Sequence, residues 1–187
     1  MSDSKLSRGI NDLFSGLPPL EKWLHALILT AVILQIISSS FMHIHADTLQ
    51  NSFGTVDWYH IIVGLGLLLL TPVFMGILLK RRTWRDLYPW LAGNFSVIKE
   101  DIGILRTFSL PPSRPAGLAA CVEGLGLLAL LAAVLSGALW FTSMRQGWTE
   151  TADLLSLHKT LVGLIETYVY GHGGFALLHF IAWWRKH

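Results

Sequence analysis

The chain has 187 residues, of which 52% are hydrophobic and only 14% are charged, and its net charge at neutral pH is +2. This composition excludes a disordered protein and indicates an integral membrane protein with one domain over residues 1–187. The single cysteine, Cys121, excludes an internal disulfide, a cysteine-based zinc or iron–sulfur site and a haem attached through Cys-x-x-Cys-His.

Four segments are apolar and long enough to cross a bilayer, which takes roughly 20 helical residues. In chain order they are residues 20–41, 58–79, 117–141 and 154–184. Because the loops between spans one and two and between spans three and four are short, neighbouring spans should run antiparallel. The sequence therefore predicts an all-α integral membrane protein, a four-helix up-down bundle. The fourth segment exceeds the length of a span, so we expect it to tilt or to project from the bilayer.

Positive charge is unevenly distributed along the chain. Basic residues gather before the first span, after the fourth span and in the loop between spans two and three, whereas residues 46–57 contain none and residues 142–153 contain only Arg145. By the positive-inside rule, both termini and the long loop are cytoplasmic. We interpret the basic run at 80–85 as a topology signal and not as a nucleic-acid site.

The long loop is itself patterned. Residues 86–108 mix aromatic, aliphatic and charged side chains, which is typical of a helix lying in the cytoplasmic interface of the membrane. Tryptophans such as Trp23 and Trp140 fall near the predicted span ends, as an aromatic belt would.

Five histidines lie inside the predicted spans, where ionisable side chains are costly and usually functional. They are His25, His60, His158, His172 and His179. The predicted topology puts His60 and His158 near the outer face, and His25 and His172 near the cytoplasmic face. His158 and His172 are 14 residues apart, about 21 Å along a helix and close to four turns, so they face nearly the same way.

Two histidines from opposed helices at one height can be the axial ligands of a haem iron. The two levels therefore predict two haems, one near each face. Zinc is the alternative metal. Structural zinc takes four protein ligands in a tetrahedron, and two histidines per level do not supply that number. His43 is the one credible substitute for His60. Glycines on the same helices, among them Gly64, Gly124 and Gly126, let a macrocycle or a neighbouring helix approach, and taken alone they favour ordinary helix packing.

Several motifs together resemble one family. They are EKWLH in the first span, YHIIVG in the second, EGLGLLALLAAVLSGALWF in the third, and LHKTLVGLIETYVYGH followed by GGFALLHF in the fourth. The chain resembles the bacterial cytochrome b561 family, which includes the b-type cytochrome subunits of membrane nickel–iron hydrogenases and formate dehydrogenases. The similarity covers nearly the whole chain.

The resemblance implies a four-helix membrane cytochrome with two haem b groups. By the matching motifs, His25 and His172 would ligate the inner haem, and His60 and His158 the outer one. Such proteins carry electrons between a periplasmic partner and the quinone pool in the bacterial inner membrane. The chain departs from the family at Lys159, where some members carry an acid, and this leaves the partner of the outer haem open.

Two imidazoles per iron leave no open position for a substrate, so each haem should transfer single electrons. Other polar residues near the spans are candidates for contacts to haem propionates or to quinone. They are Lys22, Arg81, Arg145, Lys159, Glu123, Glu166 and His179. The basic ones can equally be topology or snorkelling residues. The two glutamates can carry protons for quinone chemistry, or they can be neutral acids hydrogen-bonded to a neighbouring helix.

We therefore expect a di-haem cytochrome that exchanges electrons with quinone and with a periplasmic dehydrogenase, a hydrogenase or a soluble redox protein. A stand-alone superoxide:ubiquinone oxidoreductase is one alternative, and a non-redox haem carrier or assembly module is another. Whether the chain is itself an enzyme stays open, no catalytic residue is predicted, and a homodimer is compatible with the sequence.

Overall fold

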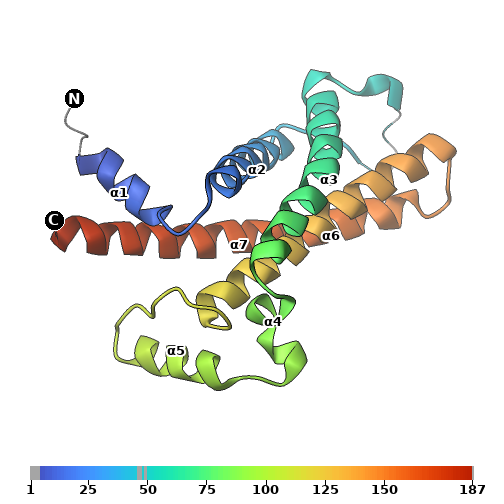
Figure 1. Cartoon of the computed structure of the whole chain (residues 1–187). Coiled ribbons are helices and arrows are strands. Elements are labelled where there is room, and N and C mark those ends of the chain that lie inside the picture. The colour runs from blue at the N-terminus through green and yellow to red at the C-terminus, as the bar shows by residue number, and fades with distance from the viewer. Residues whose placement is uncertain (1–4, 46–47, 49, 187) are drawn as a thin grey trace. The chain divides into compact units, whose positions relative to one another are not determined.

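The computed structural model describes residues 5–45, 48 and 50–186, and this part of the chain is entirely helical, without a β-strand (Figure 1). The prediction of an all-α protein is confirmed. The α-helices are α1 (Lys5–Leu13), α2 (Pro19–Ser39), α3 (Thr55–Arg81), α4 (Trp84–Leu87), α5 (Ser96–Arg106), α6 (Leu118–Gln146) and α7 (Thr151–Lys186). Two 3₁₀ turns, η1 (Gln50–Ser52) and η2 (Pro89–Ala92), lie in the loops.

Among the described residues, α2, α3 and α6 are long and apolar enough to cross a membrane. They correspond to the first three predicted spans. With 36 residues, α7 is also long enough, but Glu166 and His172 interrupt its apolar run, and it falls outside that set. A fourth crossing by α7, and with it the four-helix bundle, stays a prediction.

The chain forms two compact units, each described here by itself. The central unit comprises Trp23–Gly76 and Leu127–Glu166. The terminal unit comprises the chain up to Lys22, the segment Ile77–Gly126, and the chain from Thr167 onward. That both units belong to one domain over residues 1–187 stays a prediction.

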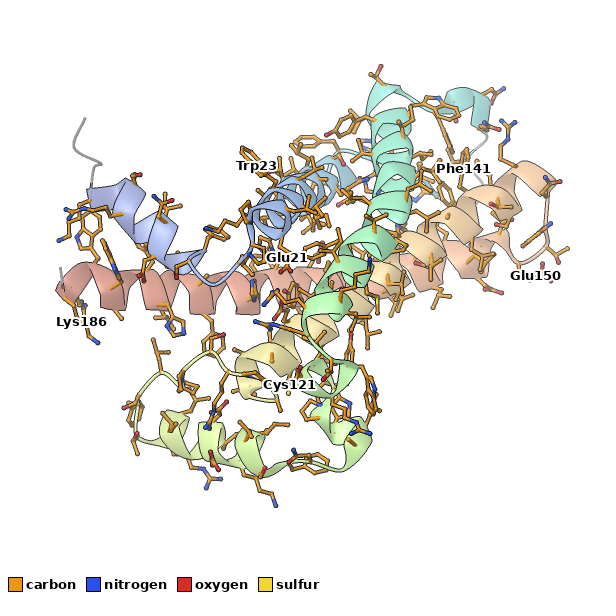
Figure 2. The ribbon with its side chains drawn as sticks, viewed as in Figure 1. Glu21, Trp23, Cys121, Phe141, Glu150 and Lys186 are labelled. Carbon is orange, nitrogen blue, oxygen red and sulfur yellow. The ribbon has the colours of Figure 1, made fainter. Side chains whose placement is uncertain are left out.

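The core of the central unit is an apolar cluster of Ile44, Ile61, Trp140 and Leu155, each at most 7% exposed. Phe53, from the loop after α2, stacks on Trp140 with ring centroids 6.4 Å apart. Large aromatic side chains bury more apolar surface than any others, so they dominate such a core. Trp140 thus packs inward, unlike a residue of an aromatic belt, whereas Trp23 is 78% exposed, as a belt requires (Figure 2).

In the terminal unit, α1 lies alongside the C-terminal part of α7 (Figure 1). Gly9 makes this possible, because a Cβ there would lie 2.7 Å from the Phe180 ring and 2.9 Å from the Trp183 ring. Lys5 Nζ lies 4.6 Å from the centroid of the Trp184 ring, a cation–π distance.

The loop before α6 is anchored by Asp101 of α5, which is fully buried. Its carboxylate accepts hydrogen bonds from Arg114 Nη2 at 2.6 Å and from the backbone N–H of Leu118 at 2.7 Å. A carboxylate on the first N–H groups of a helix satisfies donors that the helix itself cannot.

The predicted interfacial helix over residues 86–108 is shorter than expected. Only Ser96–Arg106 forms α5, and the residues before it form α4 and η2.

Candidate functional site

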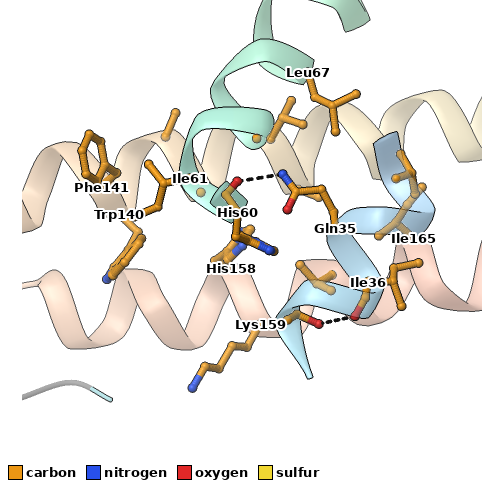
Figure 3. Close-up of a pocket in the computed structure, with 18 of the residues that line it drawn as sticks. Gln35, Ile36, His60, Ile61, Leu67, Trp140, Phe141, His158, Lys159 and Ile165 are labelled. Atoms are coloured by element: carbon orange, nitrogen blue, oxygen red, sulfur yellow. Dashed lines mark hydrogen bonds between the residues drawn. The ribbon is translucent and has the colours of Figure 1, made fainter. Parts of the chain in front are cut away.

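A cavity of about 370 Å³ lies in the central unit, among α2, α3, α6 and α7. His60 and His158 both line it, and Figure 3 shows their rings side by side. The rest of the wall is mostly aliphatic. It includes Val32, Ile61, Leu130, Val134 and Ile165. An apolar cavity with a few convergent polar groups is the usual form of a site for a cofactor or a small molecule.

Each of the two histidines is held by a serine of the preceding helix. Nδ1 of His60 lies 2.9 Å from Oγ of Ser38, and Nδ1 of His158 lies 3.0 Å from Oγ of Ser136. Both serines are buried, at 7% and 5% exposure. Since Nδ1 is engaged in both rings, Nε2 is the nitrogen that remains for a ligand in the cavity.

Backbone and amide groups complete the site. A Cβ on Gly137 of α6 would lie 3.0 Å from Cε1 of His158, so the ring packs directly on this helix. Gln35 of α2 donates a hydrogen bond from Nε2 to the carbonyl oxygen of His60 at 2.8 Å (Figure 3). Its Oε1 is buried and has no hydrogen-bond partner among the described residues. A buried polar atom without a partner indicates that the site accommodates a further group.

Over residues 16–185 the chain matches the family model of prokaryotic cytochrome b561. The chain belongs to the prokaryotic cytochrome b561 family. It is therefore a b-type cytochrome of the membrane, one that binds haem b and transfers electrons. No curated protein and no solved structure matches the chain.

The cavity of this cytochrome b561 is compatible with haem b. Two imidazoles converge on it from different helices, the rest of its wall is mostly apolar, and Gln35 Oε1 has no partner among the described residues. Lys159 and Glu166 also line the cavity. The Lys159 ammonium donates to the carbonyl oxygen of Ile44 at 3.4 Å, and Glu166 is half-buried.

The other predicted ligands, His25 and His172, divide between the two units. His25 is in the central unit, where its ring meets Phe74 edge-on at 6.4 Å. His172 is in the terminal unit, stacked on Tyr168 with ring centroids 5.1 Å apart. Tyr168 in turn covers Gly126 of α6, where a Cβ would overlap its ring. The pairing of His25 with His172 stays a prediction.

Two candidates of the terminal unit, Arg81 and Glu123, form ion pairs with other residues. Arg81 donates from Nε and Nη2 to the Glu21 carboxylate at 2.7 and 2.5 Å, and Glu21 is only 2% exposed. Arg82 forms an ion pair with Glu123. Glu123 thus has an arginine partner, and whether it carries protons for quinone chemistry stays a prediction.

The remaining candidates lie apart from the cavity. His43 is exposed while its neighbours Met42 and Ile44 line the cavity, so it does not take the place of His60. His179 and Arg145 are exposed, and Lys22 is half-buried. Whether any of them contacts a propionate or a quinone stays a prediction.

Three residues of the site were not predicted, namely Gln35, Ser38 and Ser136. The two serines carry a signal that could have revealed them, because each precedes its histidine by 22 residues. Gln35 carries a weaker signal, that of a lone amide in an apolar span.

Proposed function

We propose that this cytochrome b561 holds two b haems, each between two histidines, and carries electrons between a periplasmic partner and membrane quinone. The observation that carries the proposal is the single cavity lined by His60 and His158, in which both rings are anchored through Nδ1. Family membership supports the choice of haem b as the group between them.

His60 and His158 would hold the outer haem through their Nε2 atoms. Haem b, when bound, supplies an iron centre that exchanges one electron at a time. With His60 and His158 both bound to the iron, this chain would leave no position on the metal for a substrate. The wall is mostly apolar, and Lys159, which lines it, is the proposed basic contact for a propionate.

The proposal of an inner haem rests on the sequence motifs alone. His25 and His172 are its proposed ligands, and Lys22 is the proposed basic contact for a propionate, since Arg81 is already paired with Glu21. Reduction of a quinone consumes two protons with two electrons, and Glu166 and His179 are the proposed contacts for that chemistry. We place the protein in the bacterial inner membrane with both termini in the cytoplasm. The periplasmic partner is a dehydrogenase, a hydrogenase or a soluble redox protein.

The first test is the haem content of the purified full chain in detergent. We expect two b haems per polypeptide for the wild type and one for each of His60→Ala, His158→Ala and His172→Ala. His43→Ala and His179→Ala are matched controls, because these two histidines are exposed, and both should keep two haems. One haem in the wild type, or an unchanged content in His60→Ala, would refute the proposed ligand pairs.

A further inference from the structure

We propose that Ser38 and Ser136 are positioning residues for the outer haem. They select the imidazole tautomer that leaves Nε2 of His60 and His158 free for iron, and they set the reduction potential of that haem. The inference rests on the proposed function, since it requires those two histidines to be ligands.

The proton of each serine is already placed. Ser38 Oγ donates to the carbonyl oxygen of Gln35 at 3.0 Å, and Ser136 Oγ donates to the carbonyl oxygen of Ala133 at 3.0 Å. A hydroxyl has one proton to donate and two lone pairs. Each Oγ therefore meets the neighbouring Nδ1 as an acceptor, and Nδ1 must carry the hydrogen.

A neutral imidazole protonated at Nδ1 has its lone pair at Nε2. That is the form a metal needs, because a histidine binds a metal only through an unprotonated nitrogen. The serine thus sets the tautomer of each ring before haem binds. It also holds the plane of the ring, because the bond of 2.9 or 3.0 Å is kept only in one orientation.

The arrangement occurs twice, on different helices. Ser38 of α2 holds His60 of α3, and Ser136 of α6 holds His158 of α7, and in both cases the partners are 22 positions apart in the sequence. All four residues belong to the central unit. Both proposed ligands of one iron therefore have the same kind of partner, a buried neutral hydroxyl whose own proton is tied to the helix.

The partner at Nδ1 controls how strongly the ring donates to iron. An acceptor there makes the imidazole more basic, and a more basic ligand favours ferric over ferrous iron. A hydroxyl is a weaker acceptor than a carboxylate, so the outer haem keeps a higher potential than a carboxylate–histidine pair would allow. Removing the hydroxyl should raise the potential further.

The variants are Ser38→Ala and Ser136→Ala, singly and together, with Ser38→Thr and Ser136→Thr as conservative replacements that keep the hydroxyl. The structure offers two matched controls in the same unit. Thr71 donates to the carbonyl oxygen of Leu67 at 2.7 Å, and Ser143 donates to that of Trp140 at 2.7 Å, so Thr71→Ala and Ser143→Ala remove the same kind of bond at buried hydroxyls outside the cavity wall.

The potential of the outer haem is measured by redox titration of the full chain in detergent, with its signal assigned as the one lost in His60→Ala. Each alanine variant should shift the ferric–ferrous equilibrium toward ferrous by up to about tenfold, or about 59 mV, and the double variant should shift it further. The low-spin ferric electron paramagnetic resonance signal should shift as well, because the rings are freed. The threonine variants and both controls should stay at the wild-type values.

The outcomes separate this inference from the proposed function. If the wild type lacks the signal that His60→Ala removes, the proposed outer haem itself fails. If that signal is present but the alanine variants titrate like Thr71→Ala and Ser143→Ala, only the role of the serines is refuted. If an alanine variant loses the outer haem, the threonine variant at the same position decides. A threonine variant that keeps the haem at the wild-type potential supports the inference, and loss of the haem in both variants overturns it.

Discussion

The two units stabilise their polar groups in different ways. Around the cavity of the central unit, hydroxyl, amide and imidazole groups are hydrogen-bonded, as in Ser136 with His158, and the Lys159 ammonium donates to a backbone carbonyl. In the described part of the chain, the salt bridges between acidic and basic side chains lie in the terminal unit, as in Arg81 with Glu21 and Arg114 with Asp101. Charges are costly in an apolar medium unless they are paired, whereas neutral hydrogen bonds satisfy polar groups there at less cost.

Three glycines of α6 also differ between the two units in the side chains that they contact. Gly126, in the terminal unit, gives room to the ring of Tyr168, and Gly124 to Tyr88, whereas Gly137, in the central unit, gives room to the ring of His158. The first two glycines therefore serve packing, and the third serves the site. The prediction of ordinary helix packing is confirmed for Gly124 and Gly126.

The largest expected effect comes from Gly126→Ala. The added methyl group would overlap the Tyr168 ring, and overpacking of this kind costs about 1–3 kcal/mol of stability. We expect a lower thermal unfolding midpoint in detergent with an unchanged potential of the outer haem. Gly137→Ala should do the reverse, with a small loss of stability and a shift of the outer-haem signal, because its methyl group meets His158 at 3.0 Å. If Gly126→Ala and Gly137→Ala shifted the outer-haem signal equally, the distinction between a packing glycine and a glycine of the site would be refuted.

A smaller effect is expected at Tyr88, which lies between the predicted spans. Its hydroxyl donates to the carbonyl oxygen of Gly124 at 3.0 Å. Burial raises the pKa of Tyr88 above its usual value, and the negative charge of Glu123 adds to the rise. The folded protein therefore holds this proton more tightly than the unfolded chain does. The resulting stability is present below about pH 10, the unfolded pKa, and is lost as the pH rises from there through the folded pKa.

Unfolding midpoints of the wild type and Tyr88→Phe, measured between about pH 8 and pH 11, test this expectation. The variant should be less stable by about 1 kcal/mol at pH 8, because it lacks the hydrogen bond, and it should lose less stability at alkaline pH. A parallel decline of both proteins above about pH 10 would contradict the assignment to Tyr88.

The smallest expected effect is that of Lys159→Gln. A positive charge beside the cavity favours the ferrous form of the outer haem, so removing it should lower the potential, and the difference should shrink as salt is added. Redox titration at low and high ionic strength measures both effects, with Lys99→Gln in α5 as a control. A potential that is unchanged at low salt would exclude Lys159 as a neighbour of the haem.

Local composition was sufficient for much of the fold. Long apolar runs predicted α2, α3 and α6 because a helix is the structure that satisfies backbone hydrogen bonds within an apolar segment. Residues 5–13 were not recognised as a helix, although Leu6, Ile10 and Leu13 follow a helical period, because the segment is short and mostly polar. The buried role of Asp101 was also missed, because its partner Leu118 lies 17 residues away and comes near only when the loop folds back.

By itself, the sequence determined the helical class, three apolar segments of membrane-spanning length and the family, whereas the assignment of four histidines to haem stays a prediction. These features follow from hydrophobic periodicity, segment length and sequence motifs, each of which is a property of a single segment. Only the tertiary structure decided that Ser38 and Ser136 hold His60 and His158, that Trp140 packs inward, and that Arg81 and Arg82 pair with Glu21 and Glu123. Each of these contacts joins two segments, and the register between segments is set by packing.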